Sequence, residues 1–597
     1  MKVGEHREIL VGRARLLAGS LGVALAALGG AFFFVQVVQG SYFRELAENN
    51  RLRRLAIEAP RGTIVDRTGR VMVEDLPSYS LTLDRTRAHD VAGSLRFAAQ
   101  VLGRPIGELE KVMARYKRTG LFQPVLLAED LSLPEVARLR VARLEHPEFE
   151  VEVAERRFYR LGEHASHVLG YLSEVSSAEL ERAGTPYRPG DWIGRRGVER
   201  AYDRTLRGET GERVVVVDSR GLPVEEFGRT MGQPGQSLKL TIDADLQQEA
   251  ERQLADKVGA IVALDPRDGA IRALVSSPAY DPNLFTRKLA VDDWKALIDD
   301  PHHPLQNRAL QSAYSPGSVF KIVVAAAALA EGIITPAHTE YCPGAATFYG
   351  RRFHCWKKGG HGTVDLEGAL QHSCDVYFYN LGQMLGIDRI AKYARMFDFG
   401  RPTGIELDGE RSGLVPDSEW SEKVRHHKWY AGETISVAIG QGSLLTTPIQ
   451  IATMMAAIAN GGHLVTPHLV ESDTPPPTRQ LPLSPMVLAP IQRGLWKVVN
   501  DPGGTAGAAR LPDVEVAGKT GTVQVASQEA YSDANLLPWE LRNHAWFASY
   551  APASHPELVV VIFVEHGGQG SRAAAPLARA LHARFFRSTV DTGAPAS

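Results

Sequence analysis

The first long apolar segment runs from Leu16 to Val38, 23 residues without a charged side chain. A helix of that length covers the roughly 30 Å hydrocarbon core of a bilayer. The run continues into "QGSYFREL" rather than a small-residue cleavage site, which favours an uncleaved anchor over a signal peptide. Lys and Arg flank the run on both sides, so their distribution does not orient it. We predict one membrane span near the N-terminus.

The apolar periodicity then changes several times. Alternating residues up to Asp84 predict short strands with a turn at 67–70, and residues 88–147 follow helical spacing. Strand patterns return from about 151 to 234, and "MGQPGQS" at 231–237 is a linker candidate. We expect a cytoplasmic tail and transmembrane anchor over 1–43, then a pedestal over 44–236 with an inserted head at about 80–150.

The C-terminal part combines strands from its two ends with helices between them. "TIDADLQQEAERQLA" predicts a helix capped by Asp243 or Asp245, and "GAIVALDPRDGAIRALVS" predicts a hairpin. Helical patterns dominate from about 318 to 500, and strands resume in "VEVAGKTGTVQVA", "HAWFASYAP" and "ELVVVIFVEH". The pattern predicts an α+β multidomain protein whose domain at 237–588 is a mostly antiparallel sheet sandwiched by helices. The tail at 589–597 is expected to be disordered.

Composition narrows the functional classes. The 597-residue chain has 44% hydrophobic residues, as folded proteins do, and a formal net charge of −2. That charge argues against a nucleic-acid partner. Three cysteines in so long a chain do not make a disulfide scaffold.

A serine and a lysine stand where the apolar run "IVVAAAALA" begins. The i, i+3 spacing of Ser318 and Lys321 puts both on one helical face, where the amine can touch the hydroxyl. Alone this pair means little, but Ser373-Cys374-Asp375 follows 55 residues after Ser318 and Lys519-Thr520-Gly521 follows 201 after it. The order of the three elements is typical of penicillin-recognising acyl-serine transferases and β-lactamases.

Each residue of these elements has a chemical role to fill. An alcohol needs a base within hydrogen-bond reach, and a lysine serves if burial and nearby positive charge lower its pKa. We therefore predict Ser318 as nucleophile and Lys321 as base, with Lys519 supplying the second charge. Ser373 can relay the proton to the leaving amine, and Asp375 can orient the lysine or accept from substrate.

The Lys-Thr-Gly strand is predicted to bind the substrate. Lys519 and Thr520 would hold a carboxylate, and Gly521 completes the motif. The backbone N–H groups of Ser318 and Thr522 can form an oxyanion hole.

The whole chain resembles the class B penicillin-binding proteins, most closely the penicillin-binding protein 2 branch that serves cell elongation. Besides the catalytic elements, the matching segments are "RGTIVDRTGR", "IGRRGVERAYDRTLRGETG", "SPAYDPN", "AIGQGSLLTTPIQ" and "HAWFASYAP". Most relatives have Asn where Asp375 stands, whereas that branch commonly has Asp.

The resemblance implies an inner-membrane enzyme with its catalytic domain in the periplasm. It implies that the enzyme binds the D-Ala-D-Ala end of a peptidoglycan stem peptide, forms an acyl-serine and passes the acyl group to a neighbouring stem amine. β-Lactams would inhibit it, and a D,D-carboxypeptidase side activity is possible. A RodA-like SEDS glycosyltransferase would polymerise the strands, and an MreC-like scaffold is a further implied partner.

Three cysteines and one histidine fall in a single window, Cys342, Cys355, His361 and Cys374. Thiolate and imidazole in groups of four are the usual ligands of structural zinc, although the spacing is not that of a standard zinc finger. A zinc ion here would brace the floor of the active site. A Cys342–Cys355 disulfide, natural in the periplasm, and three buried free thiols are the alternatives. The chemistry itself requires no cofactor.

Several other functions share parts of this pattern. A freely diffusing β-lactamase would need neither anchor nor pedestal, and a β-lactam sensor should have more spans or a signalling module. A division-specific class B transpeptidase shares the catalytic chemistry. A catalytically silent scaffold is disfavoured by the intact Ser318, Lys321, Ser373 and Lys519.

Overall fold

The computed structural model describes residues 2–43, 52–57, 59–116, 124–182, 187, 190–217, 223–287, 289–525 and 537–591. The chain divides into two compact units. Unit 1 consists of Met1–Pro60, Pro77–Glu155 and Arg207–Gly235, and unit 2 of Arg61–Leu76, Arg156–Leu206 and Gln236–Ser597.

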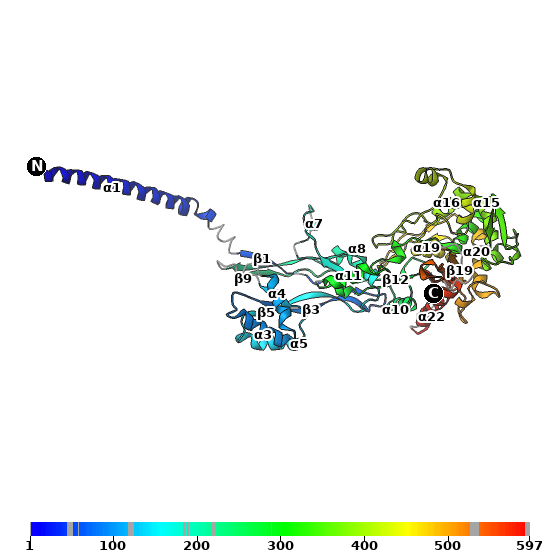
Figure 1. Cartoon of the computed structure of the whole chain (residues 1–597), viewed down its shortest axis with the longest axis horizontal. Coiled ribbons are helices and arrows are strands. Elements are labelled where there is room, and N and C mark those ends of the chain that lie inside the picture. The colour runs from blue at the N-terminus through cyan, green and yellow to red at the C-terminus, as the bar shows by residue number, and fades with distance from the viewer. Residues whose placement is uncertain are drawn as a thin grey trace. The chain divides into compact units, whose positions relative to one another are not determined.

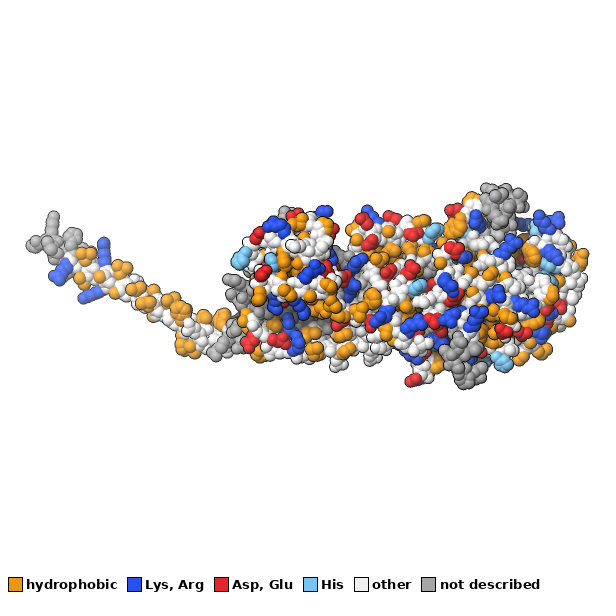
Figure 2. Space-filling model, turned by 90° about the horizontal axis from the view of Figure 1, so that it is seen from below, with side chains coloured by type: hydrophobic (Ala, Val, Ile, Leu, Met, Phe, Trp, Pro, Cys, Tyr) orange, Lys and Arg blue, Asp and Glu red, His pale blue; other side chains and the backbone are white. Residues whose placement is uncertain are grey.

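Unit 1 begins with a long apolar helix. Helix α1 (Lys2–Phe33) continues as a π-helical turn (Phe34–Val38), and Leu10–Val38 has a mean hydropathy of 2.2 with none of its surface buried. Figure 2 shows hydrophobic side chains along this helix and basic ones near its N-terminal end. Within the described residues this is the one helix long and apolar enough to cross a bilayer. The predicted apolar helix at 16–38 is therefore present.

Unit 1 also contains a three-stranded antiparallel sheet and a small helical core. The sheet has the order β1-β8-β9, with β1 Leu52–Ile57, β8 Gly211–Val217 and β9 Pro223–Thr230. The core lies between α3 (Val91–Leu102), α4 (Ile106–Arg115), α5 (Leu133–Val141), β4 (Val125–Ala128) and the end of β3 (Val71–Leu83). The segment predicted as helical at 88–147 thus includes one strand, β4, which pairs with Leu81–Leu83.

A five-stranded antiparallel sheet organises unit 2. Its order is β12-β11-β21-β20-β19, with β11 Gly259–Leu264, β12 Ile271–Ser277, β19 Ala517–Val523, β20 His544–Ala551 and β21 Leu558–Val564. The predicted hairpin is confirmed as β11–β12. Strands from both ends of the domain share the sheet, as predicted, and β19 with the Lys-Thr-Gly motif is an edge strand.

Both faces of this sheet are buried, which explains why its strands are apolar at nearly every position. In β21, Val559, Val561 and Phe563 belong to one core, and Val560 and Ile562 to the other. The first core contains α13 (Lys321–Ala330), α15 (Asp375–Leu385), α19 (Pro448–Ala459) and much of α20 (Pro485–Asn500). The second contains α10 (Ala244–Leu254) and α22 (Ala575–Asp591), which are far apart in the sequence but lie side by side in the fold (Figure 1).

Local signals fixed several boundaries. Asp243 caps α10, because its carboxylate accepts the backbone N–H groups of Asp245 and Leu246, as one of the two predicted caps. Helix α22 continues to Asp591, so the first residues of the tail expected from 589 are helical. Residues 592–597 lie outside the described part of the chain.

The segment of unit 2 that precedes the sheet has a buried ion network. Glu199 is fully buried, and its two carboxylate oxygens accept from Arg61 Nε and Arg157 Nε, each at 2.7 Å. Arg61 also binds Asp203, and Arg157 binds Asp75. Because removing one partner would leave a buried charge unpaired, these contacts fix the "RGTIVDR" segment within unit 2.

Short elements complete unit 2. Ahead of the sheet these are β2 Ile64–Val65, β10 Leu238–Lys239, the end of β5 (Phe149–Tyr159), α6 Ser166–Leu169, β6 Leu172–Glu174, α7 Ser177–Leu180, β7 Trp192–Gly194, α8 Gly197–Ala201 and α9 Asp203–Arg207. Later ones are α11 Val291–Asp299, α12 Arg308–Gln311, β13 Glu340–Cys342, β14 Ala345–Phe348, β15 Arg351–His354, β16 Gly362–Val364, α14 Leu366–Gln371, α16 Ile387–Met396, α17 Ser418–Trp420, α18 Ala431–Val437, β17 His463–Leu464, β18 Arg479–Gln480 and α21 Gly570–Ala573. Strands β13–β16 interrupt the region predicted as mainly helical.

Candidate active site

The predicted nucleophile lies on a tight turn. Ser318 belongs to a 3₁₀ turn, Gly317–Phe320, and α13 begins directly after it at Lys321. Gly317 has a φ of 55°, which a residue with a side chain rarely adopts. The turn therefore presents Ser318 at the N-terminal end of a buried helix.

Lys321 is fully buried, and its ammonium has three acceptors. Nζ lies 2.7 Å from Asp375 Oδ1, 2.9 Å from the Ser373 carbonyl oxygen and 3.2 Å from Ser373 Oγ. An ammonium has three hydrogens to donate, so these contacts use its capacity. The predicted direct contact with the Ser318 hydroxyl is absent from the hydrogen bonds among the described residues, because Asp375 and Ser373 hold the lysine.

The Ser-Cys-Asp element forms a strained entry into α15. Ser373 has a φ of 52°, Cys374 is the N-cap residue and Asp375 is the first helical residue. A serine in this left-handed region costs energy, which the surrounding packing must offset. The strain places the Ser373 carbonyl, its hydroxyl and the Asp375 carboxylate on the same ammonium.

The Lys519 strand packs against the nucleophile turn. A Cβ on Gly521 would lie 3.1 Å from the Pro316 carbonyl oxygen and 3.1 Å from Val319 Cγ2, so only glycine allows this approach. The predicted convergence of the Ser318 turn with the Lys519 strand is therefore seen within unit 2.

Lys519 is fully buried, and its ammonium donates to the Thr520 carbonyl oxygen at 3.1 Å. Burial lowers the pKa of Lys519 well below its usual value, and the positive charge of Lys321 lowers it further. We predicted that the positive charges of Lys519 and Lys321 interact, and the charge of Lys321 is the second cause of the lowered pKa of Lys519. The two amines are close enough to interact electrostatically.

The two threonines of β19 have different partners. Thr520 Oγ1 lies 2.9 Å from Thr505 Oγ1, and Thr522 Oγ1 accepts the backbone N–H of Gly570 at 3.4 Å. Thr505 and Gly570 were not singled out by the sequence argument, because neither belongs to a recognisable motif. They fix the rotamers along the edge where a substrate would lie.

Gly440 is a further residue that sequence reasoning passed over. Its carbonyl oxygen accepts the Gly317 N–H at 2.9 Å, and a Cβ on it would lie 2.0 Å from the Gly317 carbonyl oxygen. The segment "AIGQGSLLTTPIQ" therefore supports the nucleophile turn through its backbone. The glycines of this segment were the sequence signal that could have identified its role.

The four residues of the Cys/His window come together next to this site. The Sγ atoms of Cys342, Cys355 and Cys374 and a ring nitrogen of His361 all lie within 4.8 Å of one another. All three cysteines are free and buried. His361 Nδ1 lies 3.7 Å from Cys342 Sγ and 3.6 Å from Cys355 Sγ.

These distances fit a metal. Tetrahedral zinc with ordinary Zn–S and Zn–N bonds separates sulfur from nitrogen by about 3.6 Å. Without an ion, a hydrogen bond with Cys374 is the main cause that lowers the pKa of Cys355, and the same bond raises that of Cys374. One thiolate is thus favoured even before a cation arrives. The cluster could hold a metal ion.

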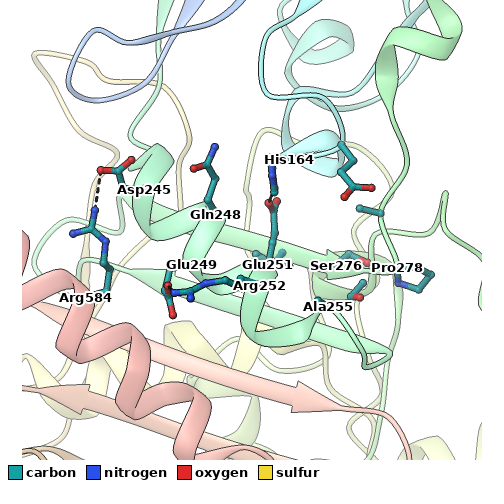
Figure 3. A pocket seen from close by; sticks show the side chains of 14 residues that line it. His164, Asp245, Gln248, Glu249, Glu251, Arg252, Ala255, Ser276, Pro278 and Arg584 are labelled. Carbon is teal, nitrogen blue, oxygen red and sulfur yellow. Dashed lines mark hydrogen bonds and ion pairs between the residues drawn. The ribbon is translucent and has the colours of Figure 1, made fainter.

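A hollow of about 670 Å³ opens elsewhere in unit 2, against α10 and the end of β12 (Figure 3). Its lining includes no predicted catalytic residue. Its charged side chains already pair with one another: Asp245 with Arg584 at 2.8 Å, and Glu251 with His164. The hollow therefore does not compete with the serine site.

Comparison with known families agrees with this geometry. Residues 259–583 match the penicillin-binding protein transpeptidase domain, and residues 56–240 match the penicillin-binding protein dimerisation domain. The chain belongs to the penicillin-binding protein family. Its C-terminal sheet and helices form the family's transpeptidase domain.

Relatives match over nearly the full chain. The peptidoglycan D,D-transpeptidase MrdA of Haemophilus influenzae is 36% identical, covering 95% of this chain and 90% of the relative. A Helicobacter pylori complex of penicillin-binding protein PBP2 with MreC contains a chain that matches with a TM-score of 0.81 at 27% identity, covering 90% of this chain and 99% of that one. A structure of a peptidoglycan synthase complex, described as coordinating polymerization and crosslinking, matches with a TM-score of 0.73 at 33% identity, covering 98% and 99%.

Proposed function

We propose that this protein is a serine-type peptidoglycan D,D-transpeptidase that cross-links stem peptides during lateral wall elongation. The observation that carries the proposal is the buried Lys321, held by Ser373 and Asp375 one turn after Ser318, with the Lys519 strand packed on the same turn. Similarity to MrdA proteins over nearly the full chain supports the elongation branch over the division-specific one. Asp375, rather than Asn, agrees with that assignment.

In the acylation step, Ser318 Oγ attacks the carbonyl carbon of the penultimate D-Ala. Its proton passes to Lys321 in the neutral amine form, and Ser373 relays a proton to the nitrogen of the departing D-Ala. The amide bond breaks and an ester to Ser318 forms. The backbone N–H groups of Ser318 and Thr522 stabilise the oxyanion.

In the second step, the amine of a neighbouring stem attacks the ester. Lys321 accepts a proton from that amine, a new amide forms, and Ser318 leaves as the alcohol after receiving a proton. A water molecule in place of the amine would give the minor carboxypeptidase reaction.

Lys519 is proposed to bind the terminal carboxylate with Thr520. Because the pKa of buried Lys519 is lowered, a carboxylate anion beside it would favour its protonated form. Substrate binding at this position is therefore linked to proton uptake.

Zinc is the metal proposed for Cys342, Cys355, His361 and Cys374, since three thiolates and one imidazole are a typical closed structural set. A bound zinc supplies no chemistry to the reaction. It would fix Cys355, which precedes Trp356, and Cys374, which precedes Asp375. The segments on both sides of the Asp375 carboxylate would then be held in place.

The apolar Leu10–Val38 helix is proposed as a single-pass inner-membrane anchor, with the catalytic unit in the periplasm. A SEDS-type polymerase and an MreC-type scaffold are the proposed partners, since related chains occur with MreC and in a peptidoglycan synthase complex.

The function is tested with nascent peptidoglycan strands and a polymerase in detergent or liposomes. The protein should produce cross-linked muropeptides that penicillin suppresses, and Ser318→Ala should produce none, whereas Ser315→Ala should remain active. In cells depleted of their elongation transpeptidase, the gene should restore rod shape. Rescue of septation alone would instead support a division role.

A further inference from the structure

An exposed tryptophan stands directly beside Asp375, which holds Lys321. The backbone N–H of Trp356 donates to Asp375 Oδ2 at 3.0 Å, while the other carboxylate oxygen binds Lys321 at 2.7 Å. The indole Nε1–H donates to the His372 carbonyl oxygen at 3.0 Å. The Asp375 carboxylate thus links Trp356 to Lys321.

The indole is held in place yet remains open to solvent. Its side chain is 60% exposed although both ends of the residue are hydrogen-bonded. Burying an aromatic ring that is already ordered costs little additional entropy, so such a ring is well suited to contact a ligand. Its exposure is not explained by packing within unit 2.

The chain segment that carries this tryptophan is basic. The segment from Tyr341 to Val364 contains four basic residues and no Asp or Glu. The basic residues are all exposed: Arg351, Arg352, Lys357 and Lys358. None of them forms an ion pair with another residue in the described part of the chain, although Arg351 lies over the Phe353 ring at 5.6 Å. An exposed cationic surface without counter-charges attracts anions.

We infer that Trp356 and these four cations form a binding surface for side-chain carboxylates of the peptide substrate, apart from its C-terminal carboxylate. This surface, the Trp356 lip, consists of Arg351, Arg352, Trp356, Lys357 and Lys358. The indole contacts the peptide beside the scissile bond, and the cations bind carboxylates farther along it. The inference rests on the proposed function, because it assumes a peptide that acylates Ser318.

An acidic peptide is favoured over a protein partner by position. Trp356 is bonded to Asp375 itself, so a ligand on the indole face lies next to the reacting groups. The same lip is adjacent in sequence to Cys355, a candidate metal ligand. A metal bound by Cys355 would fix the geometry of the lip.

The test compares two synthetic pentapeptides ending in D-Ala-D-Ala as competitors of labelled penicillin on the full-length protein. One peptide carries two free side-chain carboxylates and the other carries amides at those positions. The wild type should prefer the acidic peptide by about tenfold, and salt should reduce that preference. The double variant Lys357→Glu/Lys358→Glu should lose the preference and favour a peptide with amines at the same positions. Lys111→Glu, an exposed charge change in unit 1, is the matched control and should behave as wild type.

Trp356→Ala should weaken competition by both peptides about tenfold, as the loss of one stacking contact does, and Trp356→Phe should recover most of it. Equal competition by the two peptides in the wild type would overturn the inference, as would an unchanged preference in the double variant. If the double variant kept the preference but lost capture of an MreC-type protein, the lip would be a protein-docking surface instead. The proposed function fails separately, through absence of any penicillin adduct in the wild type.

Discussion

Lys321 Nζ lies 2.7 Å from Asp375 Oδ1, and this contact, rather than one with the nucleophile, is the shortest that the lysine makes. The carboxylate is itself fixed by the Trp356 N–H at 3.0 Å. The aspartate therefore fixes the position of the lysine amine next to the nucleophile turn. Asp375 is a positioning residue in this account.

Replacing Asp375 with Asn should remove one of the two contacts that the carboxylate makes. An amide has one oxygen, so it can accept from Lys321 or from the Trp356 N–H but not from both, and its NH2 group would face the other donor. We expect penicillin acylation to be about tenfold slower in Asp375→Asn. The measurement is the acylation rate with a labelled penicillin.

Asp375→Ala is the matched variant, because it loses both contacts. Its acylation should fall by about 100-fold, the cost of a misplaced base. An acylation rate in Asp375→Ala equal to that of the wild type would contradict the positioning role.

Gly440→Ala should displace the turn that carries Ser318, although Gly440 is far from that turn in the sequence. The new Cβ would lie 2.0 Å from the Gly317 carbonyl oxygen, so the turn that carries Ser318 must move. Displacement of about 1 Å at the nucleophile is expected to slow acylation about 100-fold. Gly461→Ala is the control, since Gly461 also has a positive φ, 83°, but nothing within 4 Å of its Cβ position. Gly461→Ala should cost about 1 kcal/mol of stability and leave the acylation rate intact. Equal acylation rates in Gly440→Ala and Gly461→Ala would refute this explanation.

The Cys/His cluster predicts one zinc ion per chain. Elemental analysis of protein purified without added metal should find stoichiometric zinc, and a chelator should lower the melting temperature. Cys342→Ser should lose the metal, whereas His354→Ala, an exposed neighbouring histidine, should keep it. Metal-free protein whose melting temperature ignores the chelator would remove zinc from the account.

Buried His582 predicts an acid-sensitive transpeptidase unit. Complete burial lowers the pKa of His582 to about 3, and its Nε2 lies 3.0 Å from Ser549 Oγ. An unfolded histidine titrates near pH 6.5, so the neutral form's contribution is full above about pH 6.5 and is lost as pH falls toward 3. Between pH 6 and 4 this residue should reduce the free energy of unfolding by about 1 kcal/mol for each unit that the pH falls.

Denaturant unfolding in detergent, followed by tryptophan fluorescence at several pH values, checks this slope. His582→Asn should be less stable overall but lose that part of the pH dependence. His555→Asn, at an exposed position, should retain it. A slope that is the same in His582→Asn as in the wild type would contradict the assignment.

Features that depend on a local sequence pattern could be predicted from the sequence. Features that depend on contacts between loops far apart in the chain could not. Asp243 before an amphipathic stretch specified a capped helix, and the apolar runs around Pro266 specified the β11–β12 hairpin. The three catalytic elements were found because their order and spacing are specific. The lowered pKa of Lys519 was not predicted, since its main cause is the burial of that side chain in the folded domain.

The lip formed by Trp356 shows the same limit. The sequence around Trp356 does not indicate that its N–H reaches Asp375, because that contact requires Cys355 and the strained Ser373 to be in place. The strained backbone of Ser373 likewise cannot be predicted from the sequence, because nothing about a serine residue indicates it. Such features follow from tertiary structure alone.

The central claim is that one hydroxyl, two amines and an edge strand surround the same carbonyl carbon. Intact-protein mass spectrometry with a labelled penicillin tests it most directly. A single stable adduct that maps to Ser318 and is absent from Ser318→Ala is the predicted result. An adduct that persists in Ser318→Ala, or a wild type that forms none, would contradict the account.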